Sequence, residues 1–281
     1  MFKKIKYTSN NGSVVLGGGQ HPLMRVRSIT GLGIPGREYS AVSVAAGQRE
    51  TGRRDLPRII TISGDLLGDG DALENLERVT YADGTLELNF GEKQRRIHCK
   101  LNNMTNPERI IPGRLISFAV QFLCDDPYFE DAEATFVDVA GLLNNVVDTF
   151  TLPCIFTVSE NESTFFVSGV KSVYPIIHIG CTEAGTETAE YGVRISNVIT
   201  GKALTIYHRM RLLETVTIDL KERTITSSLD GNIINTLSDD SDMSEMYLLP
   251  GNNLLKVDSL SNAETNNIQI EYRSEYVAAE Y

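Results

Sequence analysis

The sequence of 281 residues contains no tryptophan, four cysteines and four histidines. Cys99, Cys124, Cys154 and Cys181 are separated by 25 or more residues, so none forms the close Cys-x-x-Cys pair typical of metal sites. The small number of cysteines also argues against a fold held together by disulfides. We therefore expect four reduced and mostly buried thiols, and neither a metal ion nor another cofactor.

Long apolar segments are also missing. No stretch approaches the roughly 20 apolar residues that a membrane-spanning helix needs. The basic start of the chain, Met-Phe-Lys-Lys-Ile-Lys, is not followed by the apolar core of a signal peptide. We expect a protein that is made and assembled in the cytoplasm and does not insert into a membrane.

Negative charge is unevenly distributed. Residues 1–135 carry 17 basic and 17 acidic side chains, whereas residues 136–281 carry 9 and 20, which accounts for the whole net charge of −11. An acidic second half would repel a phosphate backbone. The charge pattern therefore predicts two units in different surroundings and argues against specific nucleic-acid binding.

No recognisable catalytic constellation is present. His21, His98, His178 and His208 are scattered, and no nucleophile motif accompanies them. Because the members of a catalytic triad can converge in space alone, a cell-wall hydrolase remains an alternative hypothesis. We expect no enzymatic activity.

Two glycine-rich segments invite a nucleotide-binding interpretation. Residues 31–36 (Gly-Leu-Gly-Ile-Pro-Gly) match the pattern G-x-G-x-x-G, but a proline lies inside it and residues 39–44 alternate like a strand, where the motif requires a helix. Residues 17–19 lack the Gly-Lys-Ser/Thr ending of a phosphate loop. Both segments are typical of loops.

Two polar motifs are equally weak. Asp239, Asp240 and Asp242, with Glu245 nearby, could surround Ca²⁺, but they lack the glycine and terminal glutamate of an EF-hand loop, which favours a solvated acidic loop. Residues 161–163 (Asn-Glu-Ser) match a glycosylation acceptor, which carries no meaning without secretion.

The middle of the chain contains a long strand with an abrupt end. In residues 117–124, Phe118, Val120, Phe122 and Cys124 fall on one face, which is the period of a half-buried strand. Pro127, in the sequence Asp-Asp-Pro-Tyr-Phe, cannot donate a backbone hydrogen bond and ends the ladder. This stop predicts a boundary between domains at 1–130 and 131–281.

The first domain is expected to be β-rich with one helix. Asp71 and Glu74 have the spacing of a capping box and precede apolar residues on one helical face. Residues 9–12 (Ser-Asn-Asn-Gly) predict a hairpin turn. Expected strands are 2–7, 14–16, 25–30, 39–44, 58–63, 86–90, 95–101 and 115–124.

The second half is expected to be almost all strand and turn. Short alternating segments recur with turns such as Asp230-Gly231, a pattern that predicts an antiparallel β-sandwich. Expected strands are 175–179, 194–199, 203–207, 215–220, 224–227, 254–257 and 268–272.

The basic cluster of this sequence consists of Arg49, Arg53, Arg54 and Arg58. It is either an exposed loop with solvated charges or a subunit-interface loop that engages an acidic surface, such as that of a neighbouring copy. These four arginines are our candidate interface residues.

Three segments together resemble the distal tail proteins of siphophages, with related proteins in some contractile tails. Residues 57–64 (Pro-Arg-Ile-Ile-Thr-Ile-Ser-Gly) look like the family's strand before its helix. Residues 120–122 running into 126–129 (Asp-Pro-Tyr-Phe) resemble its central segment. Residues 249–254 followed by 268–273 resemble its Pro-Gly-x-Asn turn and last strand. The order matches over nearly the whole chain.

The resemblance implies a mainly β protein with an N-terminal β-sandwich carrying one helix and a C-terminal galectin-like antiparallel β-sandwich. It also implies a structural role: six copies form a hub ring at the distal end of the tail tube, on the virion tail tip. Implied partners are the tail tube protein, the tail-associated fibre or lysin protein and receptor-binding proteins. A neutral first domain suits crowding in such a ring.

An alternative function is a carbohydrate-binding module that attaches the tail to cell-wall glycans. Sugar sites generally use an exposed aromatic platform, and the sequence offers Tyr174, Tyr191, Tyr207, Tyr247 and Tyr272 in or beside strands. Packing explains most of these tyrosines more simply.

Overall fold

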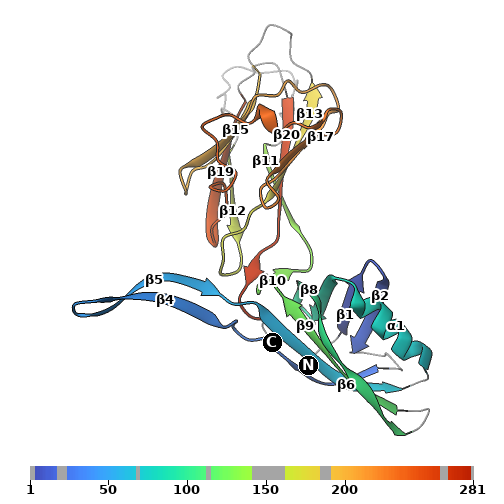
Figure 1. Ribbon diagram of the computed structural model, residues 1–281. Coiled ribbons are helices and arrows are strands. Elements are labelled where there is room, and N and C mark those ends of the chain that lie inside the picture. The colour runs from blue at the N-terminus through green and yellow to red at the C-terminus, as the bar shows by residue number, and fades with distance from the viewer. Residues whose placement is uncertain are drawn as a thin grey trace. The chain divides into compact units, whose positions relative to one another are not determined.

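A computed structural model describes residues 4–17, 24–67, 70–111, 115–140, 162–183, 191–259 and 265–279 (Figure 1). The chain divides into two compact units. Unit 1 comprises Met1–Glu133 and Glu275–Tyr281, and unit 2 comprises Ala134–Ser274. Strands dominate both units and the one described α-helix lies in unit 1, so the mainly β architecture with one α-helix is confirmed.

Unit 1 is built on a nine-stranded antiparallel sheet with the order β2-β1-β7-β8-β9-β6-β3 and two short strands, β10 and β21, beside it. The long strand β8 bends the sheet into two layers, because its first residues pair with β7 and its later residues pair with β9. The strands are β1 Lys4–Ser9, β2 Gly12–Gly17, β3 Met24–Thr30, β6 Arg58–Leu67, β7 Gly84–Asn89, β8 Gln94–Ile111, β9 Leu115–Cys124, β10 Phe129–Asp131 and β21 Glu275–Tyr276.

The layers enclose one core. Strand β9 buries alternate residues, Ile116 through Cys124, as the period of two predicts. The free edges also approach each other, since a Cβ on Gly17 of β2 would lie 2.5 Å from Val26 Cγ2 of β3. Gly17 therefore allows the sheet to close over its core.

Helix α1 (Gly70–Tyr81) covers this core with Leu76 and Val79, both fully buried. It begins one residue earlier than expected, so Asp71 lies in the first turn and is not the N-cap. The β1–β2 hairpin holds the other end: Ser9 Oγ donates to Val79 O at 2.8 Å and Tyr7 OH donates to Ala82 O at 2.6 Å. Carbonyls at a helix end have no partner within the helix, so these bonds serve as its C-terminal cap.

Unit 2 is an antiparallel sandwich. A six-stranded sheet, β11-β20-β13-β16-β17-β18, and a four-stranded sheet, β12-β19-β14-β15, contribute to a single buried cluster. The strands are β11 Thr135–Ala140, β12 Glu162–Val167, β13 Ile176–Glu183, β14 Val193–Asn197, β15 Lys202–Ile206, β16 Thr215–Asp219, β17 Thr224–Ser227, β18 Gly231–Asn232, β19 Gly251–Ser259 and β20 Thr265–Tyr272; a short 3₁₀ helix spans Ile234–Thr236.

The division between the units lies after Glu133, close to the expected one, but the end of the chain differs from expectation. Residues 275–281 were assigned to the second domain, whereas they belong to unit 1. Strand β21 pairs with β10, and Ala279 N donates to Leu32 O at 3.0 Å. The guanidinium of Arg95 lies 3.7 Å from the centre of the Tyr276 ring. These contacts are long-range, so no local sequence pattern announces them.

Some residues named in the sequence analysis lie outside the described part of the chain. Cys154, His21 and Asn161 lie outside the described residues, as do two of the three glycines at 17–19. Cys99, Cys124 and Cys181 are buried, as expected. In the described part of the chain, no helix is long and apolar enough to cross a membrane.

Candidate subunit-interface arm

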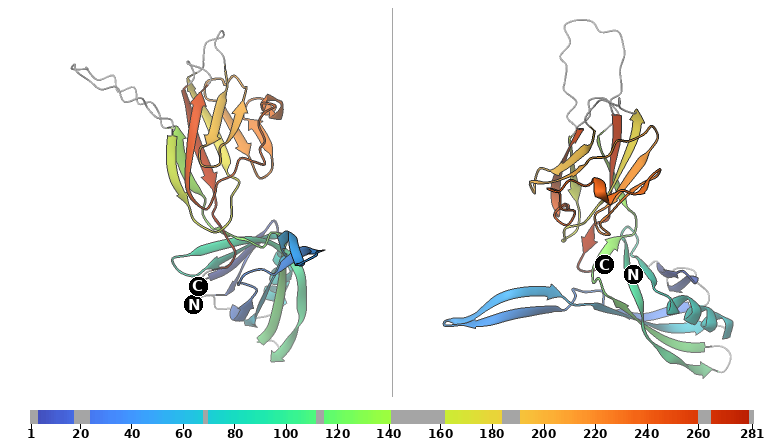
Figure 2. Two further views of the ribbon diagram at one scale, coloured as in Figure 1. Left: turned by 90° about the vertical axis from the view of Figure 1, so that its left-hand side faces the viewer. Right: turned by 45° about the horizontal axis from the view of Figure 1, so that its top comes forward.

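Strands β4 (Arg37–Val44) and β5 (Gly47–Asp55) form a separate two-stranded sheet, which we call the arm. In Figures 1 and 2 it extends away from the other strands of unit 1. Every β4 residue and nearly every β5 residue is exposed. The sequence pattern predicts no strand at residues 47–57, because charged residues and two glycines are unfavourable in strands and the pairing comes from β4.

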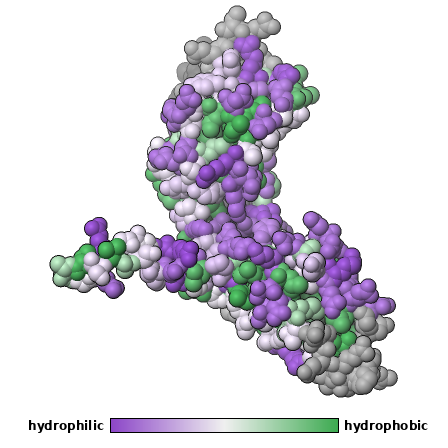
Figure 3. Space-filling model, in the orientation of Figure 1, coloured by the Kyte–Doolittle hydropathy of each residue, from purple (hydrophilic) through white to green (hydrophobic). Residues whose placement is uncertain are grey.

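The outer half of the arm carries two exposed valines on one face, beside Arg49 of β5. Val42 and Val44 lie two residues apart on β4, so both side chains point to the same side, and they are 55% and 49% exposed. Ala45 and Ala46 form the exposed turn beyond them, and Figure 3 shows green patches at this end of the arm. Exposed valines on a strand that extends from its own core are typical of a docking surface.

The arm carries less free positive charge than the sequence indicates. Arg54 is ion-paired with Glu38 across the arm at 2.5 Å, and Arg37 Nε lies 2.8 Å from Asp55 Oδ1. Arg49 and Arg53 stand opposite Val42 and Tyr39. Glu38 neutralises Arg54 of the basic cluster, so the surface combines apolar side chains with less positive charge than four arginines suggest.

The base of the arm is fixed by the central Asp-Asp-Pro-Tyr-Phe segment. Tyr128 OH donates to Asp55, which also accepts the bond from Arg37, while Leu56 N donates to Gly36 O at 2.8 Å. The hydrogen bond from Tyr128, with the Arg37 interaction, lowers the pKa of Asp55 despite some desolvation. Asp55 is therefore ionised at neutral pH and can serve both strands of the arm.

Arg58 lies directly after the arm and is buried, with 4% of its surface exposed. Its Nε donates to Pro127 O at 2.8 Å, Nη1 to Gly31 O and Gly33 O at 2.6 and 2.5 Å, and Nη2 to Val277 O at 2.6 Å. Its guanidinium also lies 4.4 Å from the centre of the Phe129 ring. Burial lowers the pKa of Arg58, and the carbonyl dipoles and the aromatic ring compensate the buried charge.

The structure thus separates the four arginines that the sequence groups together. Arg49, Arg53 and Arg54 lie on the exposed arm, but Arg58 does not, and including it among the interface residues was wrong. Arg58, Ile60 and Ile62 are alternate residues of β6, and all three are buried. Because alternate residues of a strand share a face, this spacing already indicated in the sequence that Arg58 faces the core. Whether the other three arginines contact a neighbouring copy remains a prediction.

The G-x-G-x-x-G segment belongs to the same junction. Gly31 and Gly33 supply carbonyls to Arg58, and strand β4 follows where a dinucleotide site requires a helix. Gly31 has φ +87°, and a Cβ there would lie 2.0 Å from Ile59 O. The glycine is therefore required by the close approach of two backbones.

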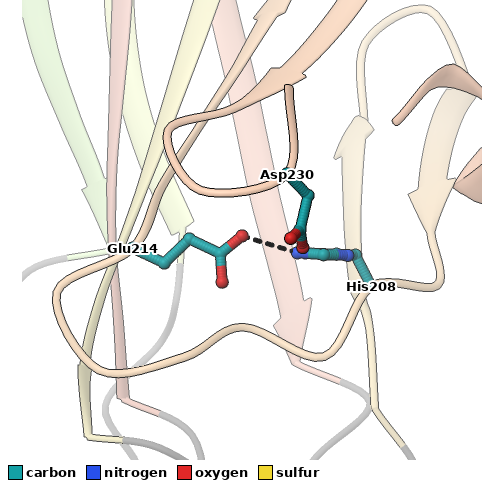
Figure 4. A group of neighbouring side chains, drawn as sticks. All are labelled: His208, Glu214 and Asp230. Atoms are coloured by element: carbon teal, nitrogen blue, oxygen red, sulfur yellow. Dashed lines mark hydrogen bonds and ion pairs between the residues drawn. The ribbon is translucent and has the colours of Figure 1, made fainter. Parts of the chain in front are cut away.

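Unit 2 contains a cluster that the sequence did not reveal. His208, Glu214 and Asp230 place their ligand atoms within 4.8 Å of one another, close enough in principle to share a metal ion (Figure 4). However, Arg211 lies 3.5 Å from Glu214 and 2.5 Å from Asp230. Since this guanidinium already supplies the positive charge, the cluster is complete as an ion-pair network.

Glu214 is the centre of that network and is fully buried. Burial opposes its ionisation, but hydrogen bonds from Ser227, the Arg211 backbone N–H and His208 outweigh the burial and lower its pKa to about 2. The bonds from His208 Nε2 and Arg211 N measure 2.7 and 2.8 Å. The carboxylate thus fixes the 208–214 segment to the end of β17.

Replacing Glu214 with glutamine is expected to destabilise unit 2 by about 3 kcal/mol at pH 7, because the buried donors lose a charged acceptor. The lowered pKa makes the stabilisation fully present above about pH 4.5 and lost as the pH falls through 2, so the difference between wild type and Glu214→Gln narrows in acid. Urea unfolding at pH 7 and pH 3 measures this. The exposed Glu222→Gln variant is the control, and an equal difference at both pH values would contradict the assignment.

Within the described residues, the side chains of the remaining polar motifs have local partners. Asp240 accepts a bond from Ser238, Asp242 accepts bonds from Ser244 and Glu245 pairs with Lys202 at 2.6 Å. Among the described histidines, His98 bonds Thr85 and His178 bonds Glu271, on different units. Each of these polar side chains therefore has a hydrogen-bond or ion-pair partner close by.

The tyrosines of unit 2 differ from the packing expectation. Tyr272 is buried, but Tyr174, Tyr191 and Tyr207 are 41%, 42% and 52% exposed. Each lies beside a strand end, where the period of two no longer fixes which side chains are covered.

The chain resembles known proteins in its three-dimensional structure but not detectably in its sequence. No family model matches the sequence, and no curated protein matches it. The Dit protein of phage SPP1, described as a paradigm of hub adsorption apparatus in phages that infect Gram-positive bacteria, aligns over 96% of this chain and 98% of its own, with TM-score 0.65 and 15% identity. This chain has the fold of a phage tail hub protein. The fold spans both units, as the sequence resemblance implied.

Two structures of the phage p2 baseplate in its activated conformation extend the comparison. The Sr-bound form aligns over 97% of this chain and 98% of its own with TM-score 0.53 and 13% identity, and the Ca-bound form over 96% and 98% with TM-score 0.50 and 10% identity. At such identities the likeness concerns the hub-like fold, and the function has to be argued from the residues of this chain.

Proposed function

We propose that this chain is a non-enzymatic structural protein of a phage tail tip, where copies of it join through the arm into a hub ring. The observation that carries the proposal is the arm itself: a two-stranded extension with exposed Val42 and Val44, fixed at its base by Asp55 and Tyr128. A rigid base and an apolar end suit repeated docking onto a neighbouring copy. The shared hub fold supports this role.

The ring proposal includes finer points. A single contact repeated around an axis gives a closed ring, and we propose six copies around the tail channel. The ring would link the tail tube protein to the fibre or lysin protein and to receptor-binding proteins, after assembly in the bacterial cytoplasm. Residues 1–135 carry no net charge while the second half is acidic, so crowded copies of the first part of the chain would not repel one another strongly.

Size measurement and imaging test the ring. Light scattering at micromolar concentrations is expected to give a mass near six times the 31.0 kDa of one chain, and negative-stain images should show particles with an open centre. A protein that stays monomeric across this range, with no rings in the images, would contradict the proposal.

A second candidate function is attachment to cell-wall glycans by unit 2. Arg194 and Lys202 face Asp240 and Asp242 across a polar cleft of about 210 Å³, which Thr205 also lines. Tyr207 lies just after β15, two residues beyond Thr205, and is half exposed. It is not a lining residue of the cleft, but it offers an aromatic ring close to it in sequence, and sugar sites generally use such a ring. This candidate predicts retention on purified cell-wall glycan that Tyr207→Ala abolishes and the exposed Tyr81→Ala, in unit 1, leaves unchanged.

A further inference from the structure

Two of the buried thiols of unit 1 face each other across neighbouring strands. The β8–β9 ladder pairs Lys100 with Leu123, so the next positions outward on the two antiparallel strands are Cys99 and Cys124. Both side chains are buried, at 6% and 0% exposure. Directly opposed positions bring the Cβ atoms about 4.5–5.5 Å apart, close to the spacing of a disulfide.

Cys99 is the less deeply buried of the two cysteines, at 6% against 0% exposure. Cys99 lines an open cleft of about 410 Å³, together with His98, Lys100, Asp83, Asp125 and Asp126. Cys124 lies behind it and is not among the lining residues. A small reagent in the cleft therefore comes closer to Cys99 than to Cys124.

We propose that Cys99 and Cys124 form a dithiol that a small neutral disulfide oxidises to an intramolecular disulfide, which fastens the end of β9 to β8. This inference is independent of the proposed ring. The bond would secure β9 just before residues 125–129, whose backbone and side chains hold Arg58 and the base of the arm.

The reaction balances in two exchange steps. The Cys99 thiolate attacks one sulfur of the small disulfide, so that a mixed disulfide forms and one small thiolate leaves. The Cys124 thiolate then attacks the Cys99 sulfur and releases the second small thiol. Two electrons pass to the reagent, whose two halves also take up the two protons that the cysteines lose.

The surroundings of Cys99 determine the rate of its oxidation and the charge of the disulfide reagent that reacts fastest. Hydrogen bonding to Cys124 and burial raise the pKa of Cys99, so the thiolate is scarce at neutral pH and oxidation should accelerate as the pH rises. Three carboxylates face Lys100 and His98 at the cleft, and Lys100 is already paired with Asp125 at 2.7 Å. We therefore expect a neutral disulfide to react faster than an anionic one at low salt.

The test uses the full chain with Cys154→Ser and Cys181→Ser, which leaves the two thiols of interest. After incubation with hydroxyethyl disulfide, mass spectrometry should show the loss of two hydrogen atoms, and peptide mapping should find Cys99 linked to Cys124. The melting temperature should rise by ~5 °C, because the bond closes a loop of about 25 residues. Two free thiols after treatment, cross-linked dimers, or a lowered melting temperature would overturn the proposal.

Single variants separate the two roles. In the same background, Cys124→Ser should accumulate one mixed disulfide on Cys99, because the resolving thiol is gone. Cys99→Ser should leave the buried Cys124 thiol modified at least ~10-fold more slowly than Cys99 is modified in wild type. Equal reactivity of the two variants in the folded protein would contradict the assigned order, and oxidised glutathione, which is anionic, should act more slowly than the neutral reagent.

Discussion

Replacing Arg58 with methionine is expected to lower the free energy of unfolding of unit 1 by about 3–5 kcal/mol. The four carbonyl oxygens that Arg58 binds come from separate segments: Gly31 and Gly33, Pro127 and Val277. Without the guanidinium they would be left buried and unpaired, each at a cost of about 1–3 kcal/mol before relaxation. Denaturant unfolding of the full chain, followed by a probe of unit 1, measures the change.

Two variants sharpen this measurement. Arg58→Lys keeps the charge but has three donors from one nitrogen, which cannot reach carbonyls arranged around a planar guanidinium, so we expect it to recover less than half of the loss. Arg53→Met, on the exposed arm, should change stability by less than about 0.5 kcal/mol. If Arg58→Met cost no more than Arg53→Met, the buried network would not stabilise this junction.

Placing glutamates at both valines of the arm, Val42→Glu with Val44→Glu, is expected to abolish assembly and leave single chains. The two side chains are about half exposed in one chain, so their replacement should not change the melting temperature by more than ~1 °C. Docked against another copy, however, they would bury two charges without partners, at several kcal/mol each. Light scattering against concentration measures the loss.

The matched control adds the same two charges to another exposed strand. Thr224 and Thr226 are exposed on β17 of unit 2, so Thr224→Glu with Thr226→Glu should assemble like the wild type. If both double variants assembled equally well, the outer half of the arm would not be the interface, and the ring would have to use another surface.

Local sequence patterns predicted many of the strands and the helix. The alternation from Ile116 to Cys124 matches the burial of β9 residue by residue, because a strand with one covered face must place every second side chain in the core. The hairpin at residues 9–12 and the helix near Asp71 were also found, since turn chemistry and capping act within a few residues. Strand β5 was missed because its pairing comes from β4 and its side chains are solvated.

The arm shows where local sequence patterns are not enough. Arg49, Arg53, Arg54 and Arg58 are close in sequence and alike in charge, yet one of them is a core residue. What distinguishes Arg58 is a set of partners up to 219 residues away, and no spacing rule contains them. The apolar end of the arm was equally hidden, because Val42 and Val44 also fit a half-buried strand.

By itself, the sequence determined the mainly β class, the two-part organisation with its uneven charge, and the Asp-Asp-Pro-Tyr-Phe stop, since alternation, net charge and proline geometry are local properties of the chain. Only the tertiary structure decided that this stop holds Arg58 and the base of the arm, that residues 275–279 return to unit 1, and that Cys99 faces Cys124. Those facts depend on which distant segments are brought together, and burial fixes that choice when the whole core closes.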